Sequence, residues 1–423
     1  MSEQPLPPLR VGGFAAAWET RTFESQFSFL RHNSLSRADL TSDDTGVRNI
    51  HYGDILVRFG DVIDVQVDVL PFVADPSNPR LGDVLRDGDV VFADAAEDST
   101  VGKCSEVRNS QGEVVVAGLH TIPTRPNQDF GKGFLGHALN SGAFHDQLIP
   151  LMQGSKVSSI SVSALKGCTI SFPSEPEQHE IGALFSRLDS QMSTLGQDYQ
   201  QLVQAKSALM QRMFPQGHAE EPELRLEGFK GSWDRRKLGS LGKARGGFGF
   251  PHTAQRGSAG IPFYKVSDMN LFGNERAMTR ANNYVTADQV VRHGWRPFQD
   301  VPAIIFAKVG AAVMLGRKRV VHHPFLVDNN MIGVSLDQAE WDVQFAQTTF
   351  DLLDLTRLVQ VGALPSFNPP AVEAMEVQVP RSRDEQQAIS AIFRRLDNLI
   401  EAKRLYLSKL QPVKAALLQK MFV

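Results

Sequence analysis

Two long stretches of the chain repeat apolar residues at intervals of three and four positions. The first stretch contains Ile181, Leu184, Leu188, Met192, Leu195, Tyr199, Leu202, Leu209 and Met213, with one gap at Lys206. The second contains Ile389, Ile392, Leu396, Ile400, Leu407, Leu410, Leu417 and Met421, although Lys403 and Lys414 interrupt it. This spacing is typical of a coiled-coil seam. We predict two helices, each about 55 Å long at ~1.5 Å per residue, and expect Pro412 to kink the second.

The two stretches are copies of one another. Glu177 to Phe214 aligns without gaps onto Glu385 to Phe422, and 15 of the 38 positions are identical. A shorter repeat precedes each copy, because Pro7-x-Leu9-Arg10-x-x-Gly13-Phe14-x-x-x-Trp18 recurs over residues 222–233. We call these shorter segments the opening strips. The two seams most simply pack on each other as an antiparallel pair about a pseudo-twofold axis. The alternative, that each helix packs on its own body, stays open.

Between each opening strip and its helix lies a long body, over about 19–172 and 234–378. The bodies share almost no residues at matched positions, so a duplicated frame holds two different inserts. Strand-like runs separated by turn residues occur in both, at 54–58, 89–93, 113–117, 303–307, 312–315 and 331–335. The predicted fold class is α/β (α+β): two globular mixed α/β domains, 1–172 and 216–378, with two long antiparallel coiled-coil helices, 173–215 and 379–423. One task performed twice on different targets fits this plan.

Composition is that of an ordinary globular protein. The chain has 423 residues, 42% of them hydrophobic and 22% charged, with a formal charge of -3, which excludes global disorder. Cys104 and Cys168 cannot form a disulfide framework, and no cysteine or histidine cluster has zinc spacing. No signal peptide is apparent, and Lys308 interrupts the longest apolar stretch. We expect a cytoplasmic protein.

Charge is unevenly distributed between the bodies. Residues 234–378 hold 16 basic and 13 acidic residues, whereas residues 19–172 hold 13 basic and 20 acidic residues. The second body has compact basic sets at 235–237, at Lys243 with Arg245, and at 317–319. Such sets suit phosphate binding, but a solvated turn is an equally good interpretation of any one of them.

Motifs that would carry chemistry are missing or out of context. Asn368-Pro369-Pro370 is similar to an adenine methyltransferase motif, but Ala371 replaces the required aromatic residue. Glu401 and Lys403 have a nuclease-like spacing, yet they lie on a predicted helix. The glycines at 246–249 lack the spacing of a phosphate-binding loop. We therefore predict no catalytic residues and no metal site.

The order and duplication of these features resemble the specificity subunit of type I restriction-modification systems, over essentially the whole chain. The motifs are Leu-Arg-x-x-Gly-Phe-x-x-x-Trp in each opening strip, Glu-Gln-x-x-Ile at each helix start, Phe-x-Arg-Leu-Asp within each helix and Met-Phe at its end. The first body adds the segments 49–55, 87–94, 97–100, 117–121 and 154–157, and the second adds 260–266 and 328–330.

The resemblance implies a non-catalytic subunit in which each body is a target-recognition domain that reads one half of an asymmetric bipartite DNA site. It implies methyltransferase subunits, usually two, that dock on the helices, and restriction subunits. S-adenosylmethionine, ATP and Mg would belong to those partners, and this chain would hold no cofactor. We expect DNA contacts from Lys103, Arg125, Lys156, Lys243, Arg245, Lys308 and Arg317, and helix pairing and partner docking from Leu188, Leu202, Leu396 and Leu410. A coiled-coil scaffold that binds no DNA is the alternative.

Overall fold

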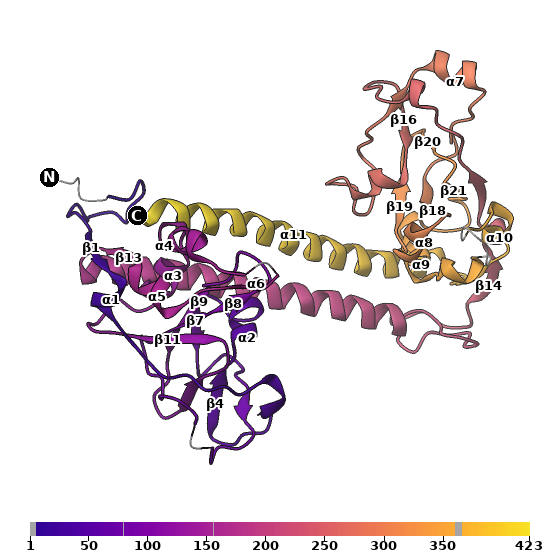
Figure 1. Cartoon of the computed structure of the whole chain (residues 1–423). Coiled ribbons are helices and arrows are strands. Elements are labelled where there is room, and N and C mark those ends of the chain that lie inside the picture. Colours follow the sequence, from indigo (N-terminus) through magenta and orange to yellow (C-terminus); the bar gives the residue numbers. More distant parts are fainter. Residues whose placement is uncertain (1–5, 79, 155, 360–365) are drawn as a thin grey trace. The chain divides into compact units, whose positions relative to one another are not determined.

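The computed structural model describes residues 6–78, 80–154, 156–359 and 366–423. The chain divides into two compact units, one formed by Met1–Asp198 with Lys403–Val423 and the other by Tyr199–Ala402. Each unit contains one body and segments of both long helices, which are the longest ribbons of Figure 1. These helices are α6, Glu175–Arg212, and α11, Arg383–Met421.

The first unit is a mixed α/β fold with two larger sheets. The first sheet has the strand order β2 (Phe27–Phe29), β11 (Thr121–Pro126), β7 (Val90–Ala93), β9 (Cys104–Arg108), β5 (Val62–Asp64). The second has the order β10 (Val114–Ala117), β4 (Val47–Ile50), β6 (Phe72–Val73), β3 (Leu40–Thr41). Two-stranded sheets join β1 (Glu19–Thr22) to β13 (Thr169–Phe172) and β8 (Ala95–Ala96) to β12 (Ser158–Ser159). The short helices are α1 (Phe23–Gln26), α2 (Tyr52–Val57), α3 (Phe134–Asn140), α4 (Gly142–Leu148) and α5 (Val162–Gly167).

The second unit uses different sheets. A four-stranded sheet has the order β15 (Gly242–Gly246), β21 (Met331–Leu336), β18 (Ala303–Ala307), β19 (Lys318–Val321). A three-stranded sheet has the order β17 (Tyr284–Val285), β16 (Ile261–Tyr264), β20 (Leu326–Val327), and β14 (Asp234–Lys237) pairs with β22 (Glu376–Val379). The short helices are α7 (Ala287–His293), α8 (Ala311–Met314), α9 (Val343–Leu352) and α10 (Pro369–Glu373). The mixed α/β class predicted for both bodies is confirmed.

Two of the six predicted strands are wrong. Residues 54–58 belong largely to helix α2, because the His51 side chain accepts a hydrogen bond from the Gly53 backbone N–H and caps the helix start. Residues 312–314 fall on helix α8, and Leu315 is its C-cap, because alanine, methionine and leucine are strong helix formers. The other four runs coincide with β7, β10, β18 and β21.

The long helices pair antiparallel within each unit. In the first unit, the contacts of α6 with α11 run from Asp198 with Lys403, at 2.6 Å, to Phe185 with Phe422, whose ring centroids lie 5.8 Å apart. In the second, Lys206 lies 2.7 Å from Asp397. The lysines that interrupt the predicted seams therefore pair with aspartates of the opposite helix. Each helix also contacts its body, since Phe185 of α6 stacks on His137 and the Ser390 hydroxyl group of α11 donates to Asp342, so the predicted pairing and packing on the bodies occur together. Helix α11 continues through Pro412.

Each opening strip joins the end of one long helix to the start of the other. In the first unit, Leu9 N–H donates to the Lys420 carbonyl, and Arg10 pairs with Glu177 at the start of α6. The second unit repeats this arrangement in full: Leu224 donates to the Arg212 carbonyl, and Arg225 forms two bonds of 2.9 Å with Glu385. The sequence repeat is thus a repeat of contacts, and it holds two unlike bodies in the same local frame.

Candidate nucleic-acid interface

Three turns of the second body surround a cavity of about 410 Å³. Its lining residues are Lys308, Val309, Asn329, Asn330, Ser366, Phe367 and Asn368. Backbone hydrogen bonds join the turns: the Lys308 N–H donates to the Asn330 carbonyl at 2.8 Å, and the Phe367 N–H donates to the Lys308 carbonyl at 3.3 Å. The cavity is therefore built on the ends of β18 and β21, which fix the position of Lys308.

The turn at Asp328 to Asn330 packs closely against a neighbouring glycine. Asp328 is buried, and its Oδ1 accepts a hydrogen bond from the Asn330 N–H at 3.0 Å. Burial raises the pKa of the Asp328 carboxyl group. Gly247 packs so closely that a Cβ atom there would lie 1.9 Å from the Asp328 carbonyl oxygen. Gly247 is therefore closely packed, whereas a Cβ atom at Gly249 would meet nothing within 4 Å.

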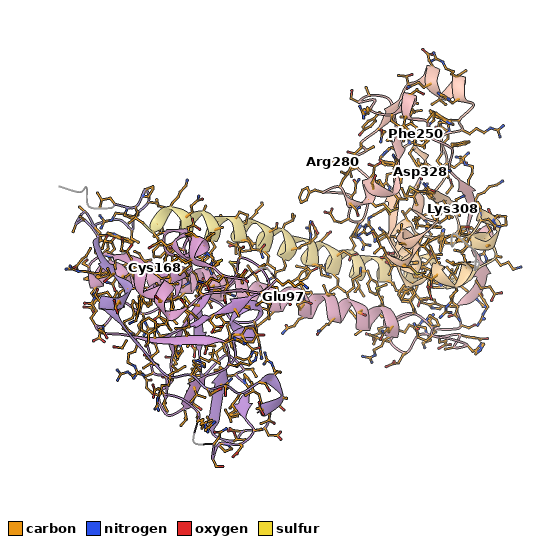
Figure 2. The ribbon with its side chains drawn as sticks, in the orientation of Figure 1. Glu97, Cys168, Phe250, Arg280, Lys308 and Asp328 are labelled. Carbon is orange, nitrogen blue, oxygen red and sulfur yellow. The ribbon has the colours of Figure 1, made fainter. Side chains whose placement is uncertain are left out.

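The cavity presents a cation beside amide groups. In the described part of the chain, the Lys308 ammonium group and the Asn329 amide have no hydrogen-bond partner, and both Asn329 and Asn330 are exposed. Asn368 caps α10 by accepting from the Ala371 N–H. Figure 2 places Lys308 and Asp328 on the same body. Ammonium groups bind phosphates, and asparagine amides bind base edges, so this cavity has the chemistry of a nucleic-acid contact.

The other predicted basic residues of the second body differ in exposure and in their contacts within the protein. Lys243 and Arg245 are two positions apart on β15 and so share a face of the strand. Lys243 is exposed, whereas Arg245 lies over the Phe298 ring at 4.0 Å and burial lowers its pKa. Arg317 donates to the Asn270 side chain.

The predicted basic set at 317–319 is mostly occupied by the fold itself. The Lys318 ammonium group is buried and donates to the Leu353 carbonyl at 2.8 Å. Arg319 donates to the carbonyls of Asn274 and Lys318. Within this set, Arg317 is the residue whose hydrogen bond, to Asn270, is exposed at the surface. The three adjacent positive charges therefore do not form one phosphate site.

The predicted residues of the first body do not gather into a basic surface. The Lys103 ammonium group donates to the carbonyls of Leu56 and Phe59, and burial lowers its pKa. Arg125 forms a two-bond pair with Asp89. Lys156 is exposed. Two of these three side chains therefore already have partners inside the protein.

All the DNA contacts predicted from the sequence are lysines and arginines, and no uncharged polar residue is among them. Asn329 and Asn330 are one omission, and a group of His51, Tyr52, Asp94 and His120 in the first body is another. All six residues lie in segments that carried the family resemblance, which was the available signal.

The four leucines predicted to pair the helices are all partly buried. Leu188 and Leu202 lie on α6, and Leu396 and Leu410 lie on α11. Leu396 packs against the second core, which includes Phe393. These positions leave part of each side chain accessible on the helix surface.

Among the described residues, one group has the geometry of a metal site. Atoms of Asp61, His137 and Asp189 lie within 4.8 Å of one another. The Lys414 ammonium nitrogen is 2.6 Å from both carboxylates and already supplies a positive charge there. We assign no metal to this group. In the same part of the chain, no helix has the length and apolarity needed to cross a membrane.

Comparisons with known proteins agree on one family. Residues 230–409 match the family model of the type I restriction modification DNA specificity domain. A putative type I restriction enzyme specificity subunit, MjaX, from Methanocaldococcus jannaschii is 20% identical over 419 residues, which cover 95% of this chain and 92% of that protein.

Solved structures have the same fold. The S subunit of a type I restriction-modification system from M. genitalium superposes with a TM-score of 0.67 at 16% identity, covering 99% of both chains. A chain from a study of complex assembly and conformational transition of the type I system gives a TM-score of 0.50 at 15% identity, covering 95% of this chain and 96% of that chain.

Proposed function

Because this chain is similar to type I restriction-modification specificity subunits in its family-model match, its curated relative and its fold, we propose that it is a member of that family, selects the DNA target for its complex and leaves catalysis to partner subunits. Residues 1–172 and 216–378 are the two target-recognition domains, and each reads one half of a bipartite DNA site. Residues 173–215 and 379–423 are the helices that set the gap between the half-sites.

The repeated frame is the observation that carries this proposal. The same contacts, Arg10 with Glu177 and Arg225 with Glu385, hold bodies whose sheets differ in strand number and order. A scaffold would have no need of two unlike bodies on one repeated frame. Two readers of unlike sequences require this arrangement, and the expected target is therefore asymmetric.

The DNA contacts proposed for the second body are Lys243, Arg245, Lys308 and Arg317, and those for the first are Lys103, Arg125 and Lys156. Lys156, Lys243 and Lys308 have free ammonium groups among the described residues and contact phosphates directly. Lys103 and Arg125 would first have to exchange their present partners. Removing all seven charges should lower the salt dependence of DNA binding by about 0.9 in slope per lost phosphate contact. Unchanged binding and slope would contradict the assignment.

Partners follow from the same family membership. We infer that two methyltransferase subunits dock on the helical frame around Leu188, Leu202, Leu396 and Leu410, and that restriction subunits join this complex. S-adenosylmethionine, ATP and Mg bind to those partners. The complex acts on DNA in the cytoplasm.

Single-molecule sequencing of adenine methylation tests the proposal. The chain is expressed with the methyltransferase encoded beside it, in a host without adenine methylation, and the methyltransferase alone is the control. We expect a split motif that appears only with both proteins. If the two proteins associate but neither methylation nor DNA binding is detected, the scaffold alternative is correct.

A further inference from the structure

Side chains from three distant segments meet on the surface of the first body. Tyr52 begins α2, Asp94 follows β7, and His120 precedes β11. The His120 Nδ1 atom is 3.2 Å from the Asp94 Oδ1 atom. The His120 ring lies edge-on to the Tyr52 ring, with centroids 5.3 Å apart and planes at 74°. We call these three residues the Tyr52 cluster.

A buried histidine supports the cluster from below. His51 is 7% exposed, and the centroid of its ring lies 4.7 Å from the centroid of the Tyr52 ring. Its Nδ1 accepts a hydrogen bond from the Gly53 N–H at 3.1 Å, so a neutral ring carries its proton on Nε2. Burial and the nearby Arg37 guanidinium lower the pKa of His51. His51 is therefore a neutral, fixed support that limits the positions open to Tyr52.

The backbone at His120 is held in an unfavourable conformation. Its φ angle is +56°, and only two other described non-glycine residues have a positive φ. The His120 carbonyl accepts a hydrogen bond from the Asp94 N–H at 3.0 Å, which ties the turn to β7. The His120 side chain is nevertheless 50% exposed. Such strain persists where the surrounding structure imposes it, and it is concentrated at functional sites.

The three side chains of the cluster are rich in hydrogen-bond acceptors, and the neighbouring Arg37 guanidinium is already paired with Asp54. With Nδ1–H directed at Asp94, the Nε2 atom of a neutral His120 is an acceptor. The Asp94 carboxylate is 25% exposed and accepts as well. No described residue bonds to the Tyr52 hydroxyl group, which can donate or accept. The Asp94 carboxylate disfavours a phosphate at this position, whereas the amino groups of adenine and cytosine in the major groove are matching donors.

We propose that Tyr52, Asp94 and His120 read a base pair of the first half-site through the exocyclic amino group of an adenine or a cytosine. This inference rests on the proposed function and assigns it a specific surface. It also accounts for the acidic character of the first body, which has 20 acidic and 13 basic residues. Specificity there comes from base edges, and phosphate contacts contribute less.

Three substitutions test the inference. His120→Gly removes the ring and relieves the positive φ, so it removes the reader without destabilising the turn. Asp94→Asn keeps the shape and replaces one acceptor by a donor, and Tyr52→Phe removes the hydroxyl group. His179→Ala, an exposed histidine on α6, is the matched control.

The readout is the methylation motif of each variant with its methyltransferase. We expect discrimination at one adenine- or cytosine-containing position of one half-site to fall about 10- to 100-fold, with the other half-site unchanged. Where methylation is too weak, binding to duplexes that differ only at that position gives the same ratio. Full discrimination in His120→Gly and Tyr52→Phe would overturn the inference and leave the proposed function intact. A wild-type complex without any split motif would instead refute the proposed function.

Discussion

Replacing Lys414 by Met removes the charge at the centre of a four-residue network in the first unit. The Lys414 ammonium nitrogen is 2.6 Å from carboxylate oxygens of both Asp61 and Asp189. The His137 Nε2 atom is 2.9 Å from Asp189, and its Nδ1 atom faces the Gly133 carbonyl at 2.5 Å. Both ring nitrogens of His137 thus face oxygen atoms, and the Lys414 ammonium group is the lysine charge that faces both carboxylates.

The expected cost follows from the exposure of the partners. Removing one member of a fully buried ion pair costs about 3–5 kcal/mol, because the other charge is left without compensation. Here Lys414 is 17% exposed and Asp189 is 31% exposed. We therefore expect a loss of about 2–3 kcal/mol, below the fully buried range. Methionine keeps most of the apolar stem of the lysine, so the loss reports charge more than packing.

Hydrogen exchange followed by mass spectrometry measures this cost locally, on peptides of α3 and the first unit, since a two-unit chain need not unfold in one step. Lys409→Met, an exposed position on the same helix, is the control and should change stability by less than about 0.5 kcal/mol. The double variant Lys414→Met, Asp189→Asn should recover part of the loss. An unchanged Lys414→Met, or a double variant no more stable than the single one, would refute this electrostatic account.

Three further predictions concern the long helices and their partners. Arg225→Ala leaves Glu385, whose side chain is 3% exposed, without its two-bond partner and should lower the free energy of unfolding by about 2–4 kcal/mol. The control Arg381→Ala breaks only an exposed pair and should lower it by less than about 1 kcal/mol. Urea titration compares the two variants. Polar substitutions at all four of Leu188, Leu202, Leu396 and Leu410 should abolish helix pairing and copurification of the methyltransferase, and an intact complex would be the contrary result. Burial raises the pKa of Asp189, but its hydrogen bonds to His137 and Lys414 outweigh burial and lower the pKa overall. Its contribution to stability is therefore full above the unfolded pKa of about 3.9 and is lost as the pH falls through the lower folded pKa. Wild type should therefore lose more stability than Asp189→Asn in acid, as urea midpoints at neutral and acidic pH would show.

The predicted seams show how far a sequence pattern reaches. Heptad-like spacing identified α6 and α11, because a helix places every third or fourth residue on one face regardless of its surroundings. Lys206 and Lys414 read only as interruptions, since the pattern contains no information on what lies opposite. The structure places Asp397 and Asp189 there, and the repeat had already aligned these two aspartates with each other.

The strand predictions show where local pattern fails. The run at 303–307 is buried on every residue and forms β18, but the equally apolar run at 312–315 is a short helix. Apolar character alone does not separate these cases, whereas side-chain type does: 303–307 holds two isoleucines and a phenylalanine, and 312–315 holds mainly the helix formers alanine, methionine and leucine.

The sequence by itself determined the duplicated plan, the two long helices, the mixed α/β class and the family resemblance, since each depends on periodicity or on order along the chain. Only the tertiary structure decided which polar residues remain free for a ligand. Carbonyl and carboxylate groups of the protein already bind the charged groups of Lys103, Arg125 and Lys318. In contrast, the surface includes side chains of Lys308, Asn329 and His120. A charge written in the sequence is available for binding only if no partner within the fold has taken it, and that depends on contacts between segments far apart in the chain.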